Sequence, residues 1–394
     1  LEKEKILQNE IIAHKEQKNI RQRLIIYISV IGLIVFFFLS ILILRLFIHK
    51  RKANRIITER NEALQTAIEE INAQKEEISA QRDEIESQRD LVVEQKDKIE
   101  IINKEMTDSI YYAKRIQSAM LLSQENRSAL LGNHFVFFLP RDIVSGDFYW
   151  ATQINNWLII TVADCTGHGV PGAFMSMLGI SFLNEIVRKK EVTNAAQVLN
   201  ELRDAVIDAL KQADDHRELR EWLAKTSSVK DGMDVSLIAI DKNTGRCQWA
   251  GANSSLYIVR EQTLPPISVL YGPDFSDKNV ASIEYQGYVL YEIKGDNMPV
   301  AIHLKMDHFT NHEFQLIGND RIYLFTDGFP DQFGGPKGKK FLYSKFKALI
   351  LETSLLNIPE QGKQIKSVYQ EWLGSNSDDH NKQTDDITVV GIKI

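Results

Sequence analysis

The sequence predicts an α+β fold for the C-terminal two thirds of the chain: a layered α/β sandwich of two antiparallel β-sheets flanked by helices. We expect a transmembrane helix and a long coiled-coil helix to precede it. Three observations predict this order: an uncharged apolar run, a seven-residue repeat free of Gly and Pro, and short apolar runs that alternate with turn signals and helical stretches. The formal net charge of −6 gives no basic face, so we expect no nucleic-acid partner.

The run LIIYISVIGLIVFFFLSILIL at residues 24–44 holds 21 residues and no charged side chain. A helix rises about 1.5 Å per residue, so this run spans roughly 30 Å, the thickness of a hydrocarbon core. A buried core helix usually keeps a polar face, and a signal peptide has a shorter apolar core. We therefore predict a single-pass transmembrane helix at residues 24–44, in the cell inner (cytoplasmic) membrane.

The flanks of this run bear on its orientation. Basic residues that follow it closely favour a cytoplasmic C-terminal side: Arg45, Lys50, Arg51, Lys52 and Arg55. Basic residues before it weaken that assignment: Lys15, Lys18, Arg21 and Arg23. Because the chain begins with Leu1 rather than Met, we expect residues 1–23 to be the flank of a truncated upstream region.

Residues 45–106 carry a seven-residue repeat, visible in QKEEISA, QRDEIES, QRDLVVE and QKDKIEI at 74–101. An apolar side chain recurs at one heptad position: Ile57, Leu64, Ile71, Ile78, Ile85, Val92, Ile99 and Met106. This spacing predicts a left-handed coiled coil and hence a homodimer. The second core position is polar, so the predicted dimer is weak and a solvated single helix stays open as the alternative: Gln74, Gln81, Gln88 and Gln95.

Residues 107–132 are expected to form a junction helix. The segment TDSIYYAKRIQSAMLL at 107–122 departs from the repeat, and either Thr107 or Ser109 could cap a new helix. Its amphipathic face would hold Ile110, Ala113, Ile116, Gln117 and Met120. A stiff helix joined to a folded domain can pass a rotation or register shift to it, which we state as a hypothesis.

The remaining residues, 133–394, hold strand-like apolar runs with turn signals such as Asn243-Thr244-Gly245 between them. Aspartates stand at the ends of these runs: Asp147, Asp164, Asp327 and the pair Asp385-Asp386. Taken singly, each of them is more often a turn or cap residue. If the run ends meet, the carboxylates share a small volume and need a counter-charge, which Mg²⁺ or Mn²⁺ with oxygen ligands would supply.

Other hydrolytic and metal-binding chemistries lack their residues. Cys165 has Pro171 where a Cys-x₅-Arg phosphatase needs arginine, and GGPKGKK at 334–340 lacks the spacing of a phosphate-binding loop. The two cysteines, Cys165 and Cys247, give neither a disulfide framework nor a paired zinc site. The aspartates are therefore the leading candidates for chemistry.

Six motifs of the C-terminal part resemble those of one family in content and in order: PRDIVSGDFYW, ADCTGHGVPGAFMSMLG, DGMD, WAGANSSLY, FTDGFPDQFGGPKGKKF and QTDDITVVGIKI. From about residue 108 to residue 394 the chain resembles the PPM (type 2C) metal-dependent serine/threonine phosphatases, in the bacterial sporulation stage II E-like branch. The resemblance implies a β-sandwich flanked by helices at residues 133–394, and two divalent ions, Mn²⁺ or Mg²⁺.

The resemblance also implies a set of metal ligands. Asp164 would bridge both ions, and the main-chain carbonyl of Cys165 would be a further ligand. Asp147 would join Asp164 at one ion. Asp327 and Asp385 would join it at the other.

Two more positions follow from the same comparison of motifs. His168 is a candidate catalytic residue that would protonate the leaving oxygen, and an exposed turn histidine is the alternative. Asn253 stands where some relatives carry an acidic residue for a third ion, so a third ion is not expected.

The implied function is that of a membrane-anchored, metal-dependent protein serine/threonine phosphatase. It would hydrolyse phosphoserine or phosphothreonine on a phosphorylated regulatory protein of the partner-switching or anti-sigma-antagonist type, through a two-metal-activated water. The alternative is a catalytically weak phosphatase-like signalling module that binds a regulatory partner. Residues 264–299 are an insertion without a familiar motif, which could form a partner-facing lobe.

Overall fold

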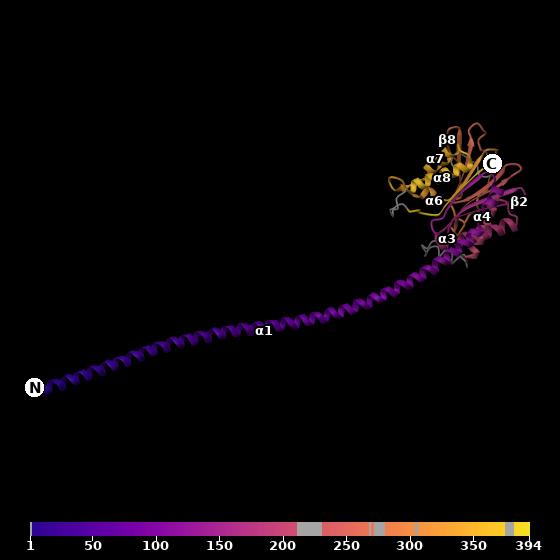
Figure 1. Ribbon diagram of the computed structural model, residues 1–394. Helices are drawn as coiled ribbons and strands as arrows, with labels where there is room; N and C mark the ends of the chain where they lie inside the picture. The colour runs from indigo at the N-terminus through magenta and orange to yellow at the C-terminus, as the bar shows by residue number, and fades with distance from the viewer. Residues whose placement is uncertain (1, 211–230, 268, 272–279, 304–305, 375–381) are drawn as a thin grey trace. The chain divides into compact units, whose positions relative to one another are not determined.

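The computed structural model describes residues 2–210, 231–267, 269–271, 280–303, 306–374 and 382–394 (Figure 1). The chain divides into two units, Leu1–Ile101 and Ile102–Ile394.

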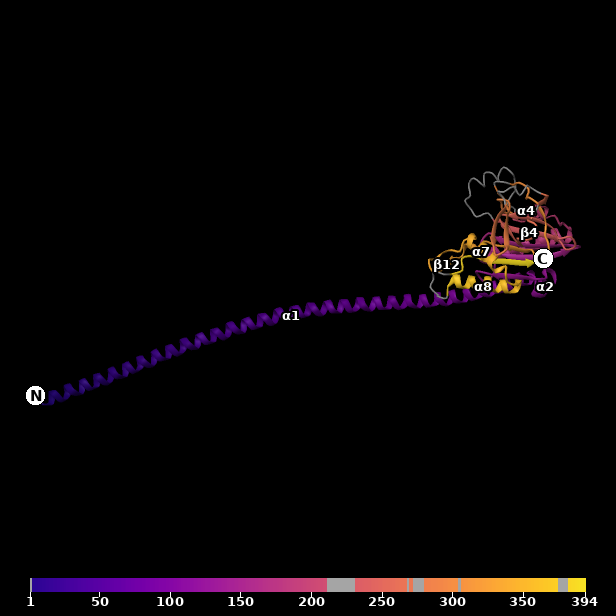
Figure 2. The same ribbon diagram turned by 90° about the horizontal axis from the view of Figure 1, so that it is seen from above.

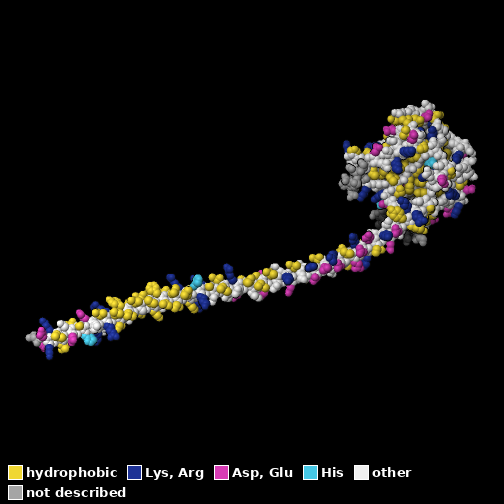
Figure 3. All heavy atoms as spheres, in the orientation of Figure 1, with side chains coloured by type: hydrophobic (Ala, Val, Ile, Leu, Met, Phe, Trp, Pro, Cys, Tyr) yellow, Lys and Arg dark blue, Asp and Glu magenta, His cyan; other side chains and the backbone are white. Residues whose placement is uncertain are grey.

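Helix α1 (Glu2–Met120) makes up the N-terminal unit, and its residues from 102 onward belong to the C-terminal unit. In residues 2–101 every side chain is exposed, including those of the apolar run 24–44. Figure 3 shows a band of hydrophobic side chains on the helix surface, with charged side chains before and after it. This part of α1 is long and apolar enough to cross a membrane.

The end of α1 differs from the sequence-based expectation. No new helix starts at Thr107 or Ser109, because α1 continues to Met120 and the Ser109 hydroxyl donates to the Glu105 carbonyl within it, at 2.8 Å. The next helix, α2 (Gln124–Leu131), begins after Ser123, whose Oγ accepts a hydrogen bond from the Asn126 amide.

The expected amphipathic face of residues 107–120 exists with one exception. Ile110, Ala113 and Met120 are partly buried, and Gln117 is buried. Ile116 was expected on this face and is 42% exposed. The polar residue, rather than its apolar neighbour, therefore takes the position that faces the protein interior.

Two six-stranded sheets form the centre of the C-terminal unit, and all their ladders are antiparallel. The first sheet runs in the order β1 (His134–Leu139), β14 (Ile387–Lys393), β11 (Arg321–Phe325), β6 (Ser255–Glu261), β9 (Tyr288–Lys294), β8 (Val280–Tyr285). The second runs in the order β2 (Phe148–Ile154), β3 (Trp157–Cys165), β4 (Met233–Asp241), β5 (Arg246–Ala252), β10 (His312–Gln315), β7 (Val269–Tyr271).

Hydrophobic side chains from alternating strand positions form three layers of core. One layer lies between the sheets. It includes Ile160 and Ile238 from the second sheet, and Leu324 and Val390 from the first. Because successive side chains point to opposite faces, each sheet also has an apolar outer face that helices cover. The predicted sandwich of two antiparallel sheets flanked by helices is confirmed.

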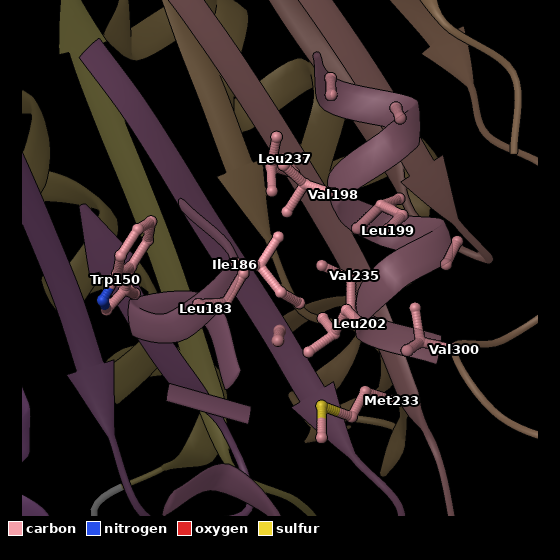
Figure 4. Packing of buried hydrophobic residues seen from close by; sticks show 14 of the residues in the cluster. Trp150, Leu183, Ile186, Val198, Leu199, Leu202, Met233, Val235, Leu237 and Val300 are labelled. Carbon is pink, nitrogen blue, oxygen red and sulfur yellow. The ribbon is translucent and has the colours of Figure 1, made fainter. Parts of the chain in front are cut away.

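Helices cover both outer faces (Figures 1 and 2). The second sheet packs against α3 (Gly169–Leu183), the π-helical turn η1 (Asn184–Lys189) and α4 (Ala195–Ala209). Figure 4 shows Leu183, Ile186 and Leu199 of these helices beside Val235 and Leu237 of β4. The first sheet packs against α6 (Gly328–Asp331), α7 (Tyr343–Thr353) and α8 (Ile358–Leu373), and a short hairpin, β12 (Phe333–Gly334) with β13 (Lys339–Lys340), lies between α6 and α7 in the chain.

Residues 264–299, for which we considered a partner-facing lobe, contribute edge strands to both sheets. β7 pairs with β10, and the hairpin of β8 and β9 pairs with β6. Residues 268 and 272–279 of this insertion lie outside the described part of the chain.

Candidate functional site

The aspartates singled out in the sequence come from neighbouring strands of both sheets. Asp147 directly precedes β2 and Asp164 is the penultimate residue of β3, in the second sheet. Asp327 follows β11 and precedes α6, and Asp385 lies two residues before β14, in the first sheet. The carboxylates therefore reach one end of the sandwich from four segments of the chain.

Asp147 ties the two sheets together. Its Oδ2 accepts hydrogen bonds from Thr326 Oγ1 at 2.7 Å and from Thr388 Oγ1 at 2.8 Å, both residues of the first sheet's region. Its Oδ1 is buried without a hydrogen-bond partner. Burial raises the pKa of Asp147 well above the usual value, against the lowering effect of the two threonines. One oxygen of this carboxylate is thus fixed, and the other is left for an external group.

Asp164 lies among the other carboxylates. Burial raises its pKa well above the usual value, and the charges of four aspartates raise it further: Asp147, Asp327, Asp385 and Asp234. Burial and the charge of Asp385 likewise raise the pKa of Asp327, whose Oδ1 is buried without a hydrogen-bond partner. The charges of the other aspartates thus act on Asp164, and its bridging role stays a prediction.

Asp385 and Asp386, the adjacent aspartates of the TDD sequence, make different contacts. Asp386 is buried, and its two oxygens accept hydrogen bonds from the backbone amides of Arg141 and Gly146, both at 2.7 Å. Asp385 is partly buried and lines a cavity of about 230 Å³ with Asp164 and His168. The side chain of Asp386 is therefore used to hold backbone, and that of Asp385 faces the site.

Sequence reasoning missed Asp234, the second residue of β4, which pairs directly with Asp164 across the β3–β4 ladder. Its Oδ1 accepts a hydrogen bond from Asn253 Nδ2 at 2.9 Å, and burial is the main cause that raises its pKa to about 6. With Asp164 and Asp327 it lines a second cavity of about 240 Å³. The motif DGMD contained this residue, but nothing in the motif told which way its side chain points.

Cys165 can take part only through its main chain. Its side chain is buried in the core, and burial raises the pKa of the thiol well above the usual value. Its carbonyl lies next to Gly146, where a Cβ would meet Cys165 O at 3.2 Å and Gly167 O at 2.7 Å. The loop after β3 thus lies against the backbone just before Asp147, which explains why residue 146 is glycine. The predicted role of the Cys165 carbonyl as a metal ligand stays a prediction.

His168 precedes the first turn of α3. Gly167 and Gly169 on either side of it have φ of +86° and +67°, in the left-handed region that favours glycine. The ring Nδ1 of His168 lies 2.9 Å from Asp142 Oδ2, and both side chains are about half exposed. This pairing orients the ring at the rim of the cavity that Asp164 and Asp385 line. Its role as a proton donor stays a prediction.

The donor set fits a hard divalent cation: buried carboxylates that repel one another, and two carboxylate oxygens, on Asp147 and Asp327, that find no hydrogen bond within the described part of the chain. Among the described residues, however, no three His, Cys, Asp or Glu side chains already stand in an arrangement that could hold an ion. Assigning individual residues to individual ions is therefore a proposal.

Comparisons with known proteins agree with this architecture. A family model described as stage II sporulation protein E (SpoIIE) matches residues 155–272. The SiaA-PP2C domain of Pseudomonas aeruginosa is 28% identical, with a TM-score of 0.57, over 74% of this chain and 98% of that chain. No curated protein sequence matches.

Two further solved structures are more distant. The PP2C phosphatase domain of SpoIIE from Bacillus subtilis, solved with a fragment of its regulatory domain, is 17% identical, with a TM-score of 0.45, over 66% of this chain and 63% of that chain. The catalytic domain of the serine/threonine phosphatase PstP, in complex with two manganese ions, is 14% identical, with a TM-score of 0.38, over 66% of this chain and 96% of that chain.

Residues 155–272 match the SpoIIE family model, and the C-terminal part of the chain has the fold of a PPM-type (type 2C) phosphatase domain. The protein is a metal-dependent protein serine/threonine phosphatase.

Proposed function

We propose that this phosphatase is anchored in the cytoplasmic membrane by residues 24–44 and removes phosphate from serine or threonine of a regulatory protein in the cytoplasm. The observation that carries the proposal is the group of buried carboxylates at one end of the sandwich, two of whose oxygens have no hydrogen-bond partner among the residues that the structure describes. Carboxylates so close together need cations to offset their mutual repulsion. Cations held in such a site can in turn offset the charge of a phosphate ester.

We assign Asp147, Asp164 and the Cys165 carbonyl to one ion, and Asp164, Asp327 and Asp385 to the other. Manganese is a suitable metal because carboxylate and carbonyl oxygens are ligands that suit Mn²⁺ as well as Mg²⁺. When bound, such ions lower the pKa of a coordinated water and offset charge on the phosphoryl group. Thr326 and Thr388 hold Asp147 so that its free Oδ1 faces the site.

His168 supplies the proton that the leaving serine or threonine oxygen needs. Asp142 holds the imidazole through Nδ1, so the other ring nitrogen is the one available at the cavity rim. Neither residue is buried, which suits a group that must exchange protons with solvent after each turnover.

The part of α1 before residue 107 is proposed to anchor the enzyme and to pair with a second copy. Every apolar residue in the heptad position of 57–106 is exposed in the single chain, as a dimer seam must be before it pairs. The basic residues after residue 44 favour a cytoplasmic catalytic domain. The substrate would be a phosphorylated partner-switching protein or anti-sigma-factor antagonist, by similarity to the stage II sporulation branch.

The test of this function is dephosphorylation of candidate phosphoserine proteins by the full chain in detergent, with Mn²⁺ and with excess chelator. We expect turnover with Mn²⁺ or Mg²⁺ and none in chelator. Undiminished turnover in chelator would contradict the two-metal site. Binding of a phosphoprotein without any turnover, at every cation concentration tried, would instead favour the phosphatase-like binding module.

A further inference from the structure

A tyrosine lines the cavity of about 240 Å³ beside Asp234, and the proposed reaction gives it no role. This residue is Tyr343, the first of α7, and it shares the cavity wall with Asp164, Asp234 and Asp327. Its side chain is 42% exposed, so it stands at the mouth of the cavity rather than in the core. A phenol at the edge of a site for a phosphate ester has the chemistry to bind that ester.

The backbone before Tyr343 is held in an uncommon conformation. Leu342 has φ of +75°, a value that favours glycine and costs free energy for a large side chain. Its amide donates to the Pro330 carbonyl at 2.7 Å, and its carbonyl accepts from the Phe346 amide at 3.1 Å. Pro330 belongs to α6, the helix that begins directly after Asp327. The start of α7, and with it Tyr343, is therefore tied to the turn that carries Asp327.

The hydroxyl of Tyr343 is a hydrogen-bond donor that keeps its proton. Partial burial raises the pKa of this phenol above the usual value, and the charges of four aspartates raise it further: Asp327, Asp331, Asp164 and Asp234. At neutral pH the group is therefore a neutral O–H, which can donate to an anion. Among the residues that the structure describes, this hydroxyl makes no hydrogen bond, so the donor is available to a ligand.

Two cavities adjoin the carboxylates, and Asp164 and Asp234 line both of them. His168 lines the cavity of about 230 Å³, and Tyr343 lines the cavity of about 240 Å³. A phosphate ester bound at Asp164 therefore has a different proton-bearing side chain in each cavity. A phosphoryl oxygen that points into the second cavity meets the charges of Asp234 and Asp327, and a neutral donor at the same wall offsets part of their repulsion.

We infer that Tyr343 is a substrate-binding residue: its phenolic O–H donates a hydrogen bond to a non-bridging oxygen of the phosphoryl group, in the cavity that Asp327 lines. This inference rests on the proposed function, which places the phosphate ester at Asp164 and Asp327. The free phosphate product carries the same oxygens. Tyr343 therefore binds inorganic phosphate as well as the ester, whatever protein carries the phosphoserine.

The test compares Tyr343→Phe with Tyr285→Phe in the full chain in detergent. Both changes remove one hydroxyl and keep the ring, and Tyr285 is an exposed residue at the end of β8. The first readout is hydrolysis of p-nitrophenyl phosphate with saturating Mn²⁺, resolved into kcat and KM. The second is the dissociation constant of inorganic phosphate from calorimetry with Mn²⁺ present, which needs no turnover. The third is the Mn²⁺ dissociation constant from equilibrium dialysis.

We expect Tyr343→Phe to weaken phosphate binding about tenfold and to raise KM by about the same factor, because a hydrogen bond to a charged group is lost. The kcat should stay within about twofold of the parent value, since the bond forms in the bound substrate as well as in the transition state. The Mn²⁺ affinity should not change, which also shows that the variant is folded. Tyr285→Phe should leave all these quantities unchanged. Tyr343→Ala should match Tyr343→Phe for inorganic phosphate.

Equal phosphate affinity in Tyr343→Phe and an active parent overturns the inference and leaves the proposed function intact. The inference also fails if Tyr343→Phe weakens Mn²⁺ binding as much as phosphate binding, because the residue then acts through the metal site. A loss that appears only in Tyr343→Ala and only with phosphoprotein substrates means that the ring contacts the protein part of the substrate, and this result overturns the inference too. A parent that shows neither turnover nor phosphate binding with Mn²⁺ contradicts the proposed function itself, and the inference with it.

Discussion

The two units of the chain differ in the kind of group that they leave unsatisfied: apolar side chains in the first unit, and carboxylate oxygens in the second. In residues 2–101 the apolar side chains are exposed, those of the run 24–44 included. In the C-terminal unit three clusters of apolar side chains are packed between and outside the sheets, while carboxylate oxygens of Asp147 and Asp327 are buried without hydrogen bonds to the described residues. Each unit therefore indicates what must come from outside the chain: an apolar surrounding for the first, and cations for the second.

Two helices with apolar sequences sharpen this contrast. The run within α1 and the stretch Gly169–Lys189, which covers α3 and η1, both have the length and hydropathy of a membrane span. Half of the second stretch is buried against the sheet of β2 to β5, and the first is not buried at all. Hydropathy alone does not distinguish these two stretches, whereas their burial does.

The largest effect is expected from removing the apolar run. A chain that lacks residues 1–45 should move from the membrane pellet to the supernatant almost completely and keep its intrinsic phosphatase activity, because no residue of the site lies there. Deleting residues 57–98 instead should leave the protein in the pellet. If the shorter chain still sediments with membranes, residues 24–44 are not the anchor.

The carboxylate site gives the next largest effect. Asp164→Asn and Asp327→Asn should each lower metal-dependent turnover by about 10³-fold or more, because an amide cannot replace a charged ligand between two cations. Asp204→Asn changes an exposed carboxylate of α4 in the same way and should have no effect. Turnover is measured on p-nitrophenyl phosphate, so that protein recognition plays no part. Retained activity in both site variants would rule out the assigned ligands.

The sequence was enough to predict the sandwich and to place four aspartates at strand ends, because each aspartate ends or precedes an apolar run that has to be a buried strand. Hydropathy and spacing could not separate Asp385 from Asp386, and only the resemblance singled out Asp385, since both are the same residue type and the fold decides which one meets backbone amides. The sequence placed both Ile116 and Gln117 on the inward face, whereas only Gln117 is buried, because hydropathy carries no information on a distant loop that needs a donor and an acceptor. The continuous helix through Thr107 was missed for a related reason: a potential cap residue is also tolerated inside a helix.

Stability in the absence of metal should fall as the pH rises. The folded-state pKa of Asp234 is about 6 against an unfolded value of 3.8, and those of Asp147, Asp164 and Asp327 are also raised. The folded state then binds more protons than the unfolded state between about pH 4 and 6, so the unfolding free energy decreases with pH in that window. Asp234 alone accounts for about 2 kcal/mol, allowing for its partial exposure.

Tryptophan fluorescence during denaturant unfolding measures this, since no tryptophan precedes residue 102 and the signal reports on the C-terminal unit. Chelator-treated protein should lose stability from pH 4 to pH 6, and saturating Mn²⁺ should remove or reverse the trend. Asp234→Asn should make the unfolding free energy depend less steeply on pH over this range. An unfolding free energy that increases over this range in chelator contradicts the burial of unpaired carboxylates.

A smaller effect is expected at the rim of the site. His168→Ala should reduce turnover of a phosphoserine protein about 10- to 100-fold, and of p-nitrophenyl phosphate much less, because nitrophenolate leaves without a proton. Asp142→Asn, which weakens the contact at Nδ1, should act in the same direction with a smaller loss. His134→Ala, far along the chain from this loop, serves as the control. Equal losses on both substrates point to a structural histidine.

The smallest effect is expected from changing the phase of α1. The heptad position that holds Ile99 and Met106 continues, seven residues apart, to Ala113 and Met120, which face the C-terminal unit. One stripe of the helix therefore serves as the predicted dimer seam before residue 107 and as the packing face after it. If a signal passes along α1, the relative phase of these two uses has to matter, because Gln117, whose side chain binds the backbone of Ser145, lies next to the same stripe.

Inserting one residue after Glu94 turns the seam by about 100° relative to the packing face, and inserting seven restores the phase to within about 20°. We expect the one-residue insertion to change phosphatase activity in vesicles a few-fold, and the seven-residue insertion to return it to the parent value. The reason is that the glutamine-containing seam is weak, so a few kcal/mol are enough to change the populations of its alternative packings. The same insertions should leave the activity of a chain without residues 1–45 less affected, since the membrane then no longer fixes the upstream end. If neither insertion changes activity in vesicles, this part of α1 is a tether, and control of the site does not pass through its phase.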